Sequence, residues 1–201
     1  MELGLKGKAA VVAGASRGLG FSIARSLGLE GARLAICSRD SGNINKACYE
    51  LKSLGIEANA YTADVSNPSA TKAFIEKAAY DLGGIDILVT NAGGPPAMSF
   101  EAIDDSMWEE GFRLNLLSTI VMIRAAIPFM KERNSGRIIN LTSIAVKQPI
   151  EGLIISNTVR AGVIGLAKTL SRELAPFNIT INNIRQSSYA KKDNARNILS
   201  R

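Results

Sequence analysis

The sequence predicts an α/β fold, in which a single domain is built on a doubly wound parallel sheet. Short apolar segments typical of buried strands alternate along the chain with amphipathic segments of helical periodicity. Strands joined by helices in this way run parallel, and the helices cover both faces of the sheet. The length of 201 residues, with 46% hydrophobic and 21% charged side chains, is that of one globular domain.

Six strands and five helices are predicted in order along the chain. Apolar runs such as AAVVA and LAIC place the strands at residues 9–13, 34–37, 57–62, 85–90, 137–141 and 180–184. The helices are expected near residues 21–29, 44–54, 68–82, 107–133 and 154–175, with Gly-Gly pairs at 83–84 and 93–94 separating elements. We assign residues 1–184 to the domain. Residues 185–201 are expected to form a basic, loosely ordered tail, in which 194–200 can form a short helix.

A glycine-rich turn after the first strand is the most informative segment. Residues 13–20 read Ala-Gly-Ala-Ser-Arg-Gly-Leu-Gly, a G-x-x-x-G-x-G spacing that differs from the generic G-x-G-x-x-G. Glycines let the backbone approach a ligand closely, and the N-terminus of the following helix suits a pyrophosphate. The turn therefore predicts a dinucleotide site, with an ordinary glycine-rich turn as the alternative.

The end of the second strand carries the signals that distinguish the two nicotinamide cofactors. Ser38, Arg39 and Asp40 follow this strand. A carboxylate there usually binds the ribose hydroxyls of NAD, whereas an arginine suits the 2′-phosphate of NADP. Arg17 can join Arg39, because guanidinium groups bind phosphates in a bidentate way. We expect NADP(H), with NAD as an alternative, unless Arg39 and Asp40 are only exposed loop charges.

Other strand ends bring further candidates to the same edge of the sheet. Asp64, followed by Val65, can accept a hydrogen bond from an adenine amine, or it can begin a turn or cap the helix after Pro68. Asn91 can brace neighbouring strands, and the small residues after it let the backbone approach a ligand. Ser143 places a hydroxyl at this edge, where it can bind a substrate carbonyl or cap a loop or helix.

These residues together resemble the short-chain dehydrogenase/reductase family, whose members have a single Rossmann-like domain. The resemblance runs from about residue 6 to residue 184 and includes Asn115, which in the family kinks its helix and binds a water leading to the active-site lysine. A polar residue within a long helix is the plain alternative. The resemblance implies an NAD(P)-dependent step on a small-molecule carbonyl or alcohol. It also implies a homo-oligomer formed by the helices near 107–133 and 152–175.

Two departures set this chain apart from the family it resembles. Ser156 and Arg160 stand where the family has its catalytic tyrosine and lysine. An aliphatic hydroxyl is a much weaker acid than a phenol, so Ser156 is a poor proton donor, whereas Arg160 keeps a charge that can hold the nicotinamide ribose. Residues 185–186 follow the sixth strand with no Pro-Gly turn, so we expect the substrate lid and seventh strand to be missing, as in a truncated chain.

The candidate site residues fall into a catalytic set and a cofactor-binding set. The candidate catalytic residues are Asn115, Ser143, Ser156 and Arg160. The candidate cofactor-binding residues are Gly14, Ser16, Arg17, Gly18, Leu19, Gly20, Ser38, Arg39, Asp64, Val65, Asn91, Ala92, Gly93 and Arg160. The function expected is an NADP(H)-dependent oxidoreductase with an atypical active site. The alternative is a catalytically impaired dinucleotide-binding protein that acts as a sensor or as a subunit of an assembly.

The composition of the chain argues against a metal site, a nucleic-acid partner and a membrane span. The chain has no histidine, which is the commonest metal ligand and general base, and no metal site is expected. Its net charge of +6 and basic tail do not come with a nucleic-acid motif, so no nucleic-acid partner is expected. No apolar run is expected to cross a bilayer, and no signal peptide is evident. Cys37, in a strand, and Cys48, on a helix, are not expected to pair, which favours the cytoplasm.

Overall fold

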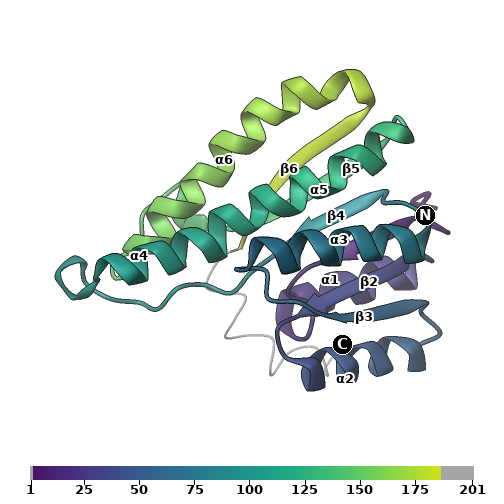
Figure 1. The fold of residues 1–201 in the computed structure, drawn as a ribbon, viewed down its shortest axis with the longest axis horizontal. Coiled ribbons are helices and arrows are strands. Elements are labelled where there is room, and N and C mark those ends of the chain that lie inside the picture. Colours follow the sequence, from purple (N-terminus) through teal and green to yellow (C-terminus); the bar gives the residue numbers. More distant parts are fainter. Residues whose placement is uncertain (1, 187–201) are drawn as a thin grey trace.

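The computed structural model describes residues 2–186 and contains one six-stranded parallel sheet. The strand order is β3-β2-β1-β4-β5-β6, so the chain starts in the middle, builds one half of the sheet and then crosses over to build the other (Figure 1). The strands are β1 Ala9–Val12, β2 Arg33–Ser38, β3 Ala58–Thr62, β4 Ile87–Thr90, β5 Gly136–Ser143 and β6 Ile179–Gln186. The predicted doubly wound fold is confirmed.

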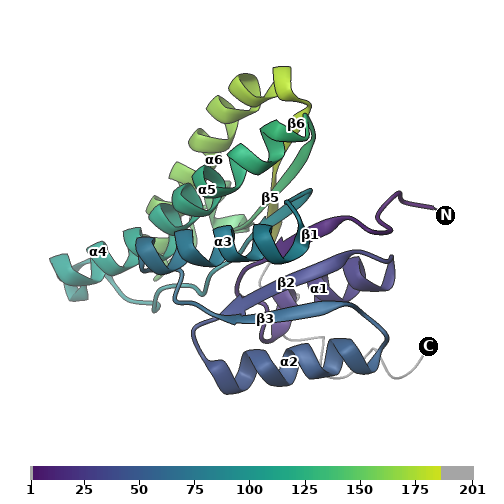
Figure 2. The same ribbon diagram turned by 45° about the vertical axis from the view of Figure 1, so that its right-hand side comes forward.

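The helices divide between the two faces of this sheet. One face is covered by α3 Pro68–Leu82, α5 Ser118–Glu132 and α6 Ile154–Leu174, the other by α1 Gly18–Leu29 and α2 Ser41–Ser53 (Figure 2). Each face has its own hydrophobic core, because alternate side chains of the buried strands point to opposite faces. In β1, for example, Val11 belongs to the first core and Val12 to the second.

The helix predicted near 107–133 is confirmed, and it contains a π-helical turn. It consists of α4 Asp105–Phe112, the π-helical turn η2 Arg113–Leu117 and α5. The segment Asp105–Glu132 has a mean hydropathy of 1.4 over its most apolar window and is long and apolar enough to cross a membrane by those measures, contrary to the expectation from sequence. Within the fold it packs against α3 and α6.

Other boundaries shift by a few residues. Strand β6 continues through Gln186, so Arg185 and Gln186 pair with β5 and do not belong to a tail. The edge strand therefore reaches as far as Ser143 on β5, and the two strands end together. The predicted helix at 194–200 and the rest of the expected tail lie outside the described residues. Short 3-10 turns complete the fold at Phe100–Ala102, Ile144–Val146 and Ala175–Phe177.

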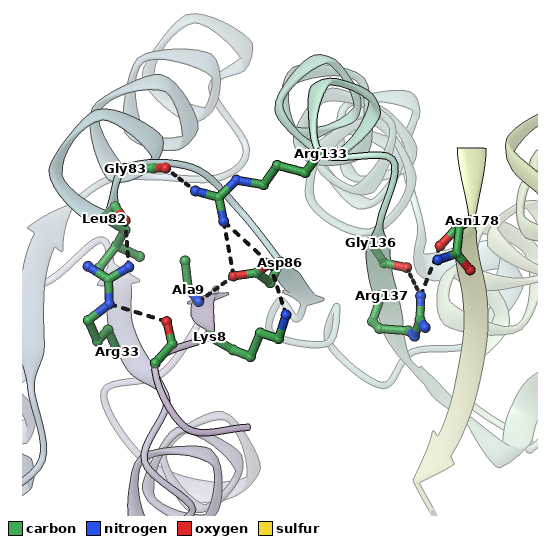
Figure 3. Close-up of polar contacts among 11 residues, drawn as sticks. Lys8, Ala9, Arg33, Leu82, Gly83, Asp86, Arg133, Gly136, Arg137 and Asn178 are labelled. Carbon is green, nitrogen blue, oxygen red and sulfur yellow. Dashed lines mark hydrogen bonds and ion pairs between the residues drawn. The ribbon is translucent and has the colours of Figure 1, made fainter. Parts of the chain in front are cut away.

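A cluster of charged residues lies at the end of the sheet where the strands begin, opposite the glycine turn. Asp86 is 9% exposed; it accepts a hydrogen bond from Ala9 N over 2.8 Å and pairs with Lys8 and Arg133 (Figure 3). Arg133 also donates to the carbonyl of Gly83 at the end of α3. Cations at a helix C-terminus complement its dipole. This cluster therefore stabilises the fold from the side away from the candidate site.

Candidate functional site

The glycine turn between β1 and α1 is built for close backbone contact. Gly14 and Gly18 have φ angles of +58° and +61°, which favour glycine. A Cβ at Gly20 would lie 2.3 Å from Gly14 O and 2.8 Å from Asn91 Nδ2, so no side chain fits there. A Cβ at Gly18 would meet nothing within 4 Å. The turn is thus tight on its protein side and open on the side where a ligand would lie.

The N-terminus of α1 is the feature that this open turn exposes. Its N-cap, Arg17, makes no side-chain hydrogen bond to the helix, and the first turn contains no acidic residue. Helices α2, α3 and α4 are instead capped by the side chains of Asp40, Asn67 and Asp104. Unpaired N–H groups and the dipole of α1 therefore point out of the turn, and they fit a pyrophosphate. Ser16 and Leu19 lie in the same turn, both half-buried.

Two charged residues, Arg39 and Asp40, follow the end of β2. Asp40 Oδ1 accepts from Asn43 N over 2.7 Å and caps α2. Ser38, 9% exposed, donates its hydroxyl to Asp40 O over 2.9 Å. Arg39 and Arg17 are exposed, and no ion pair within residues 2–186 includes either. One carboxylate oxygen of Asp40 is thus bound to the backbone of α2, whereas neither guanidinium group has an ion-pair partner among these residues.

Asp64 forms a turn after β3. Its Oδ1 accepts from both the backbone N and the hydroxyl of Ser66, at 2.9 and 2.7 Å. It does not cap the following helix, because Asn67 fills that role by accepting from Ala70 N. The cap alternative for Asp64 is therefore wrong, since the chain bends at Asp64 before the helix starts. Val65 packs against the core on one face of the sheet.

The segment after β4 is held by two asparagines from different elements. Asn91 Nδ2 donates to Gly14 O over 3.1 Å and joins the end of β4 to the glycine turn. Asn115, on the π-helical turn, donates from Nδ2 to Gly93 O over 2.7 Å. Its Oδ1 is buried without a partner among the described residues. The extra residue in the π turn brings Asn115 to this loop, where Ala92 is half-buried and Gly93 exposed.

Arg160 reaches the end of β5, the strand that ends at Ser143, from helix α6, which also carries Ser156. Ser143 Oγ accepts from Ala145 N over 3.2 Å, which leaves its hydroxyl proton free to be donated. Ser156 is 6% exposed and lies one turn before Arg160 on α6. Arg160 donates to Leu141 O over 3.3 Å and to Gly93 O over 3.5 Å, and burial lowers the pKa of its guanidinium. The side chain of Arg160 thus bridges the ends of β4 and β5.

A row of hydrogen-bonded polar side chains crosses three strands of the sheet, and it was not predicted from the sequence. Thr90 donates to Asn140 Oδ1 over 2.8 Å, and Asn140 Nδ2 donates to Asn183 Oδ1 over 3.0 Å. These three residues share one register on β4, β5 and β6. A polar residue within an otherwise apolar strand is the signal that points to them. This row of hydrogen bonds links β4, β5 and β6. The loop at Gly93 follows β4, and Ser143 ends β5.

Comparison with known proteins gives the family. The family model described as short chain dehydrogenase matches residues 8–197. The chain belongs to this family. It is 34% identical over 177 residues to short-chain dehydrogenase/reductase SDRA of Arabidopsis thaliana, covering 86% of this chain and 67% of that protein. Several other curated short-chain dehydrogenase relatives are matched over 64% of their length, so the chain spans about two thirds of such proteins.

Solved structures of short-chain dehydrogenases share the fold and differ in cofactor. L-sorbose reductase from Gluconobacter frateurii, complexed with NADPH and L-sorbose, is 32% identical with a TM-score of 0.89, over 92% of this chain and 71% of that one. NAD+-bound xylitol dehydrogenase is 27% identical with a TM-score of 0.87, over 91% and 71% of the two chains. Structures similar to this chain thus contain either NADPH or NAD+.

Proposed function

We propose that this chain is an NADP(H)-linked oxidoreductase that interconverts a small carbonyl compound and its alcohol. The open glycine turn at the uncapped N-terminus of α1 carries the proposal, because it matches a cofactor pyrophosphate in shape and in charge. Its membership in the short-chain dehydrogenase family supports the redox reaction. When bound, the cofactor supplies the hydride, and the residues of the chain hold the reacting groups.

The choice of NADP over NAD follows from the free charges at the end of β2. The carboxylate of Asp40 is held at the start of α2 by its hydrogen bond from Asn43 N. Arg17 and Arg39 are exposed and can both reach toward a phosphate at this edge. Arg39→Glu should reverse the preference between NADPH and NADH. Equal loss of affinity for both cofactors would contradict this assignment.

Ser143 and Arg160 position the substrate and the cofactor in this proposal. Ser143 keeps a hydroxyl proton that it can donate to a substrate carbonyl. Arg160 lies beside Gly93, where it can hold the nicotinamide ribose. The proton that completes carbonyl reduction comes from Ser156 or from water, and neither matches a tuned phenol as an acid. We therefore expect turnover to be slow.

The competing function is cofactor binding without turnover, and Ser156 at the position of the family's tyrosine favours it. The test is a titration of the chain with NADPH, followed by a panel of small ketones and acyl thioesters. NADPH binding with substrate-dependent oxidation supports the enzyme. Binding without oxidation supports a sensor or an assembly subunit, and absence of binding contradicts both.

A double variant tests the catalytic pair directly. Ser156→Tyr with Arg160→Lys should raise any reductase rate, because it restores a phenol beside a lysine at the same places on α6. Ser156→Thr serves as the control, since it keeps an aliphatic hydroxyl. A double variant that binds NADPH normally yet lowers a measurable rate would show that this pair does not have the proposed role.

We also propose a homo-oligomer and a cytoplasmic location. The segment Asp105–Glu132 is strongly apolar, yet only 39% of its most apolar window is buried inside the chain, which leaves apolar surface for a second copy. Sedimentation that shows only monomer at high concentration would contradict the oligomer. Cys37 and Cys48 are free and buried, which suits a reducing compartment.

A further inference from the structure

The guanidinium of Arg160 is a charged group without a charged partner. Its two hydrogen bonds go to backbone carbonyls at 3.3 and 3.5 Å, both long for N–H···O bonds. Its Nε is buried without an acceptor in the described part of the chain. None of the ion pairs found within residues 2–186 includes Arg160. Arginine stays protonated in proteins, so the positive charge at this place is uncompensated.

A half-buried cation whose Nε is buried without an acceptor is stabilised when an anion binds beside it. A bound cofactor does not supply this anion, because its negative charges are phosphates that we place at the glycine turn and at Arg39. The nicotinamide end, near Arg160, is neutral when reduced and positive when oxidised. The substrate, the other ligand of the site, can supply a negative charge there.

Arg160 is half-exposed and is held only weakly by its neighbours. Ser156 lies one turn before it on α6 and is a small side chain at a buried position. The long bonds of Arg160 to Leu141 and Gly93 are weak, so the guanidinium can turn toward an anion at little cost. A carboxylate matches the planar, singly charged guanidinium in a bidentate way, whereas a phosphate monoester carries nearly twice the charge.

We propose that the substrate is a carbonyl compound that also carries a carboxylate. Arg160, whose guanidinium has five N–H donors, binds this carboxylate beside the nicotinamide ribose, while Ser143 holds the carbonyl. This inference rests on the proposed function, because it places the substrate beside a bound nicotinamide. It names a substrate class that the fold alone leaves open.

The test uses the full chain saturated with NADPH and titrated calorimetrically with oxamate, which has a carboxylate next to a carbonyl that is not reduced. Ethyl oxamate is the neutral counterpart, and inorganic phosphate is the competing anion. The variant is Arg160→Gln. The matched control is Arg113→Gln, which removes an exposed arginine from the neighbouring π-helical turn.

We expect the chain to bind oxamate roughly tenfold or more tightly than ethyl oxamate or phosphate, as a desolvated charge pair requires. Arg160→Gln should remove this preference, and Arg113→Gln should keep it. Equal binding of oxamate and its ester, stronger binding of phosphate, or an unchanged preference in Arg160→Gln would overturn the proposal. Should Arg160→Gln fail to fold, the comparison of oxamate with its ester on the unchanged chain still decides. NADPH binding without oxamate binding overturns this inference and leaves the proposed function standing, whereas failure to bind NADPH overturns both.

Discussion

Gly20→Ala tests the cofactor turn through a clash that can be worked out from the structure. The added Cβ would lie 2.3 Å from Gly14 O and 2.8 Å from Asn91 Nδ2. The first contact is more than ~1 Å inside the separation of about 3.5 Å at which non-bonded atoms attract best. The atom that must give way is a backbone oxygen that also accepts the hydrogen bond of Asn91. The turn therefore cannot absorb the methyl group without moving.

The expected cost follows from this overlap. Inserting a methyl group into a packed site costs roughly 1–3 kcal/mol, which corresponds to a melting temperature lower by about 2–4 °C per kcal/mol in a chain of this size. Because we propose that the displaced backbone binds the pyrophosphate, NADPH affinity should also fall roughly tenfold or more. Thermal unfolding and NADPH titration measure the two effects on the same sample.

A glycine elsewhere provides the matched control. Gly165, in α6, has open space within 4 Å of its Cβ position and an ordinary helical backbone. Gly165→Ala should keep NADPH affinity and raise stability by roughly 0.5–1 kcal/mol, because alanine favours the helix. If Gly20→Ala binds NADPH and unfolds like the unchanged chain, the reasoning about the turn is refuted.

Three further predictions concern stability. Asp86→Ala should lower the free energy of unfolding by roughly 3 kcal/mol, because it leaves Ala9 N–H buried without a partner and Arg133 without its carboxylate; a loss below about 0.5 kcal/mol in urea unfolding would contradict the role of the cluster. Asn67→Ala should cost about 1 kcal/mol by removing the cap of α3, and an unchanged urea midpoint would count against that cap. Burial raises the pKa of Cys37 from 9.0 to about 12, so its contribution to stability is present below pH 9 and is lost as the pH rises from 9 toward 12. At pH 8 a thiol reagent should therefore label Cys37 only after unfolding, and rapid labelling of the folded chain would contradict its burial.

The fold could be predicted from the sequence because the patterns that mark strands and helices lie within short segments of the chain. Short strand-like segments that alternate with amphipathic helical segments predicted all six strands. The π-helical turn at Asn115 was not predicted as such, since an inserted residue in a helix leaves the hydrophobic pattern almost unchanged. Strand β6 was predicted too short because Arg185 and Gln186 are polar, yet their backbone pairs with β5.

The parts of the site that sequence did not predict depend on contacts between distant residues. The guanidinium of Arg160 reaches carbonyls 19 and 67 residues away, at Leu141 and Gly93. Asp86 was taken as part of a strand, whereas its carboxylate joins Ala9, Lys8 and Arg133. No local pattern encodes which carbonyl or cation a long side chain will meet. Such partners emerge only when the strands are placed beside one another.

We propose that the turn between β1 and α1 holds the phosphates of a nicotinamide cofactor. Calorimetric titration of the folded chain with NADPH is the decisive measurement of this binding. We expect saturable heat with one site per chain and weaker binding of NADH. A folded sample that gives no heat with NADPH, NADP+, NADH or NAD+ would contradict it.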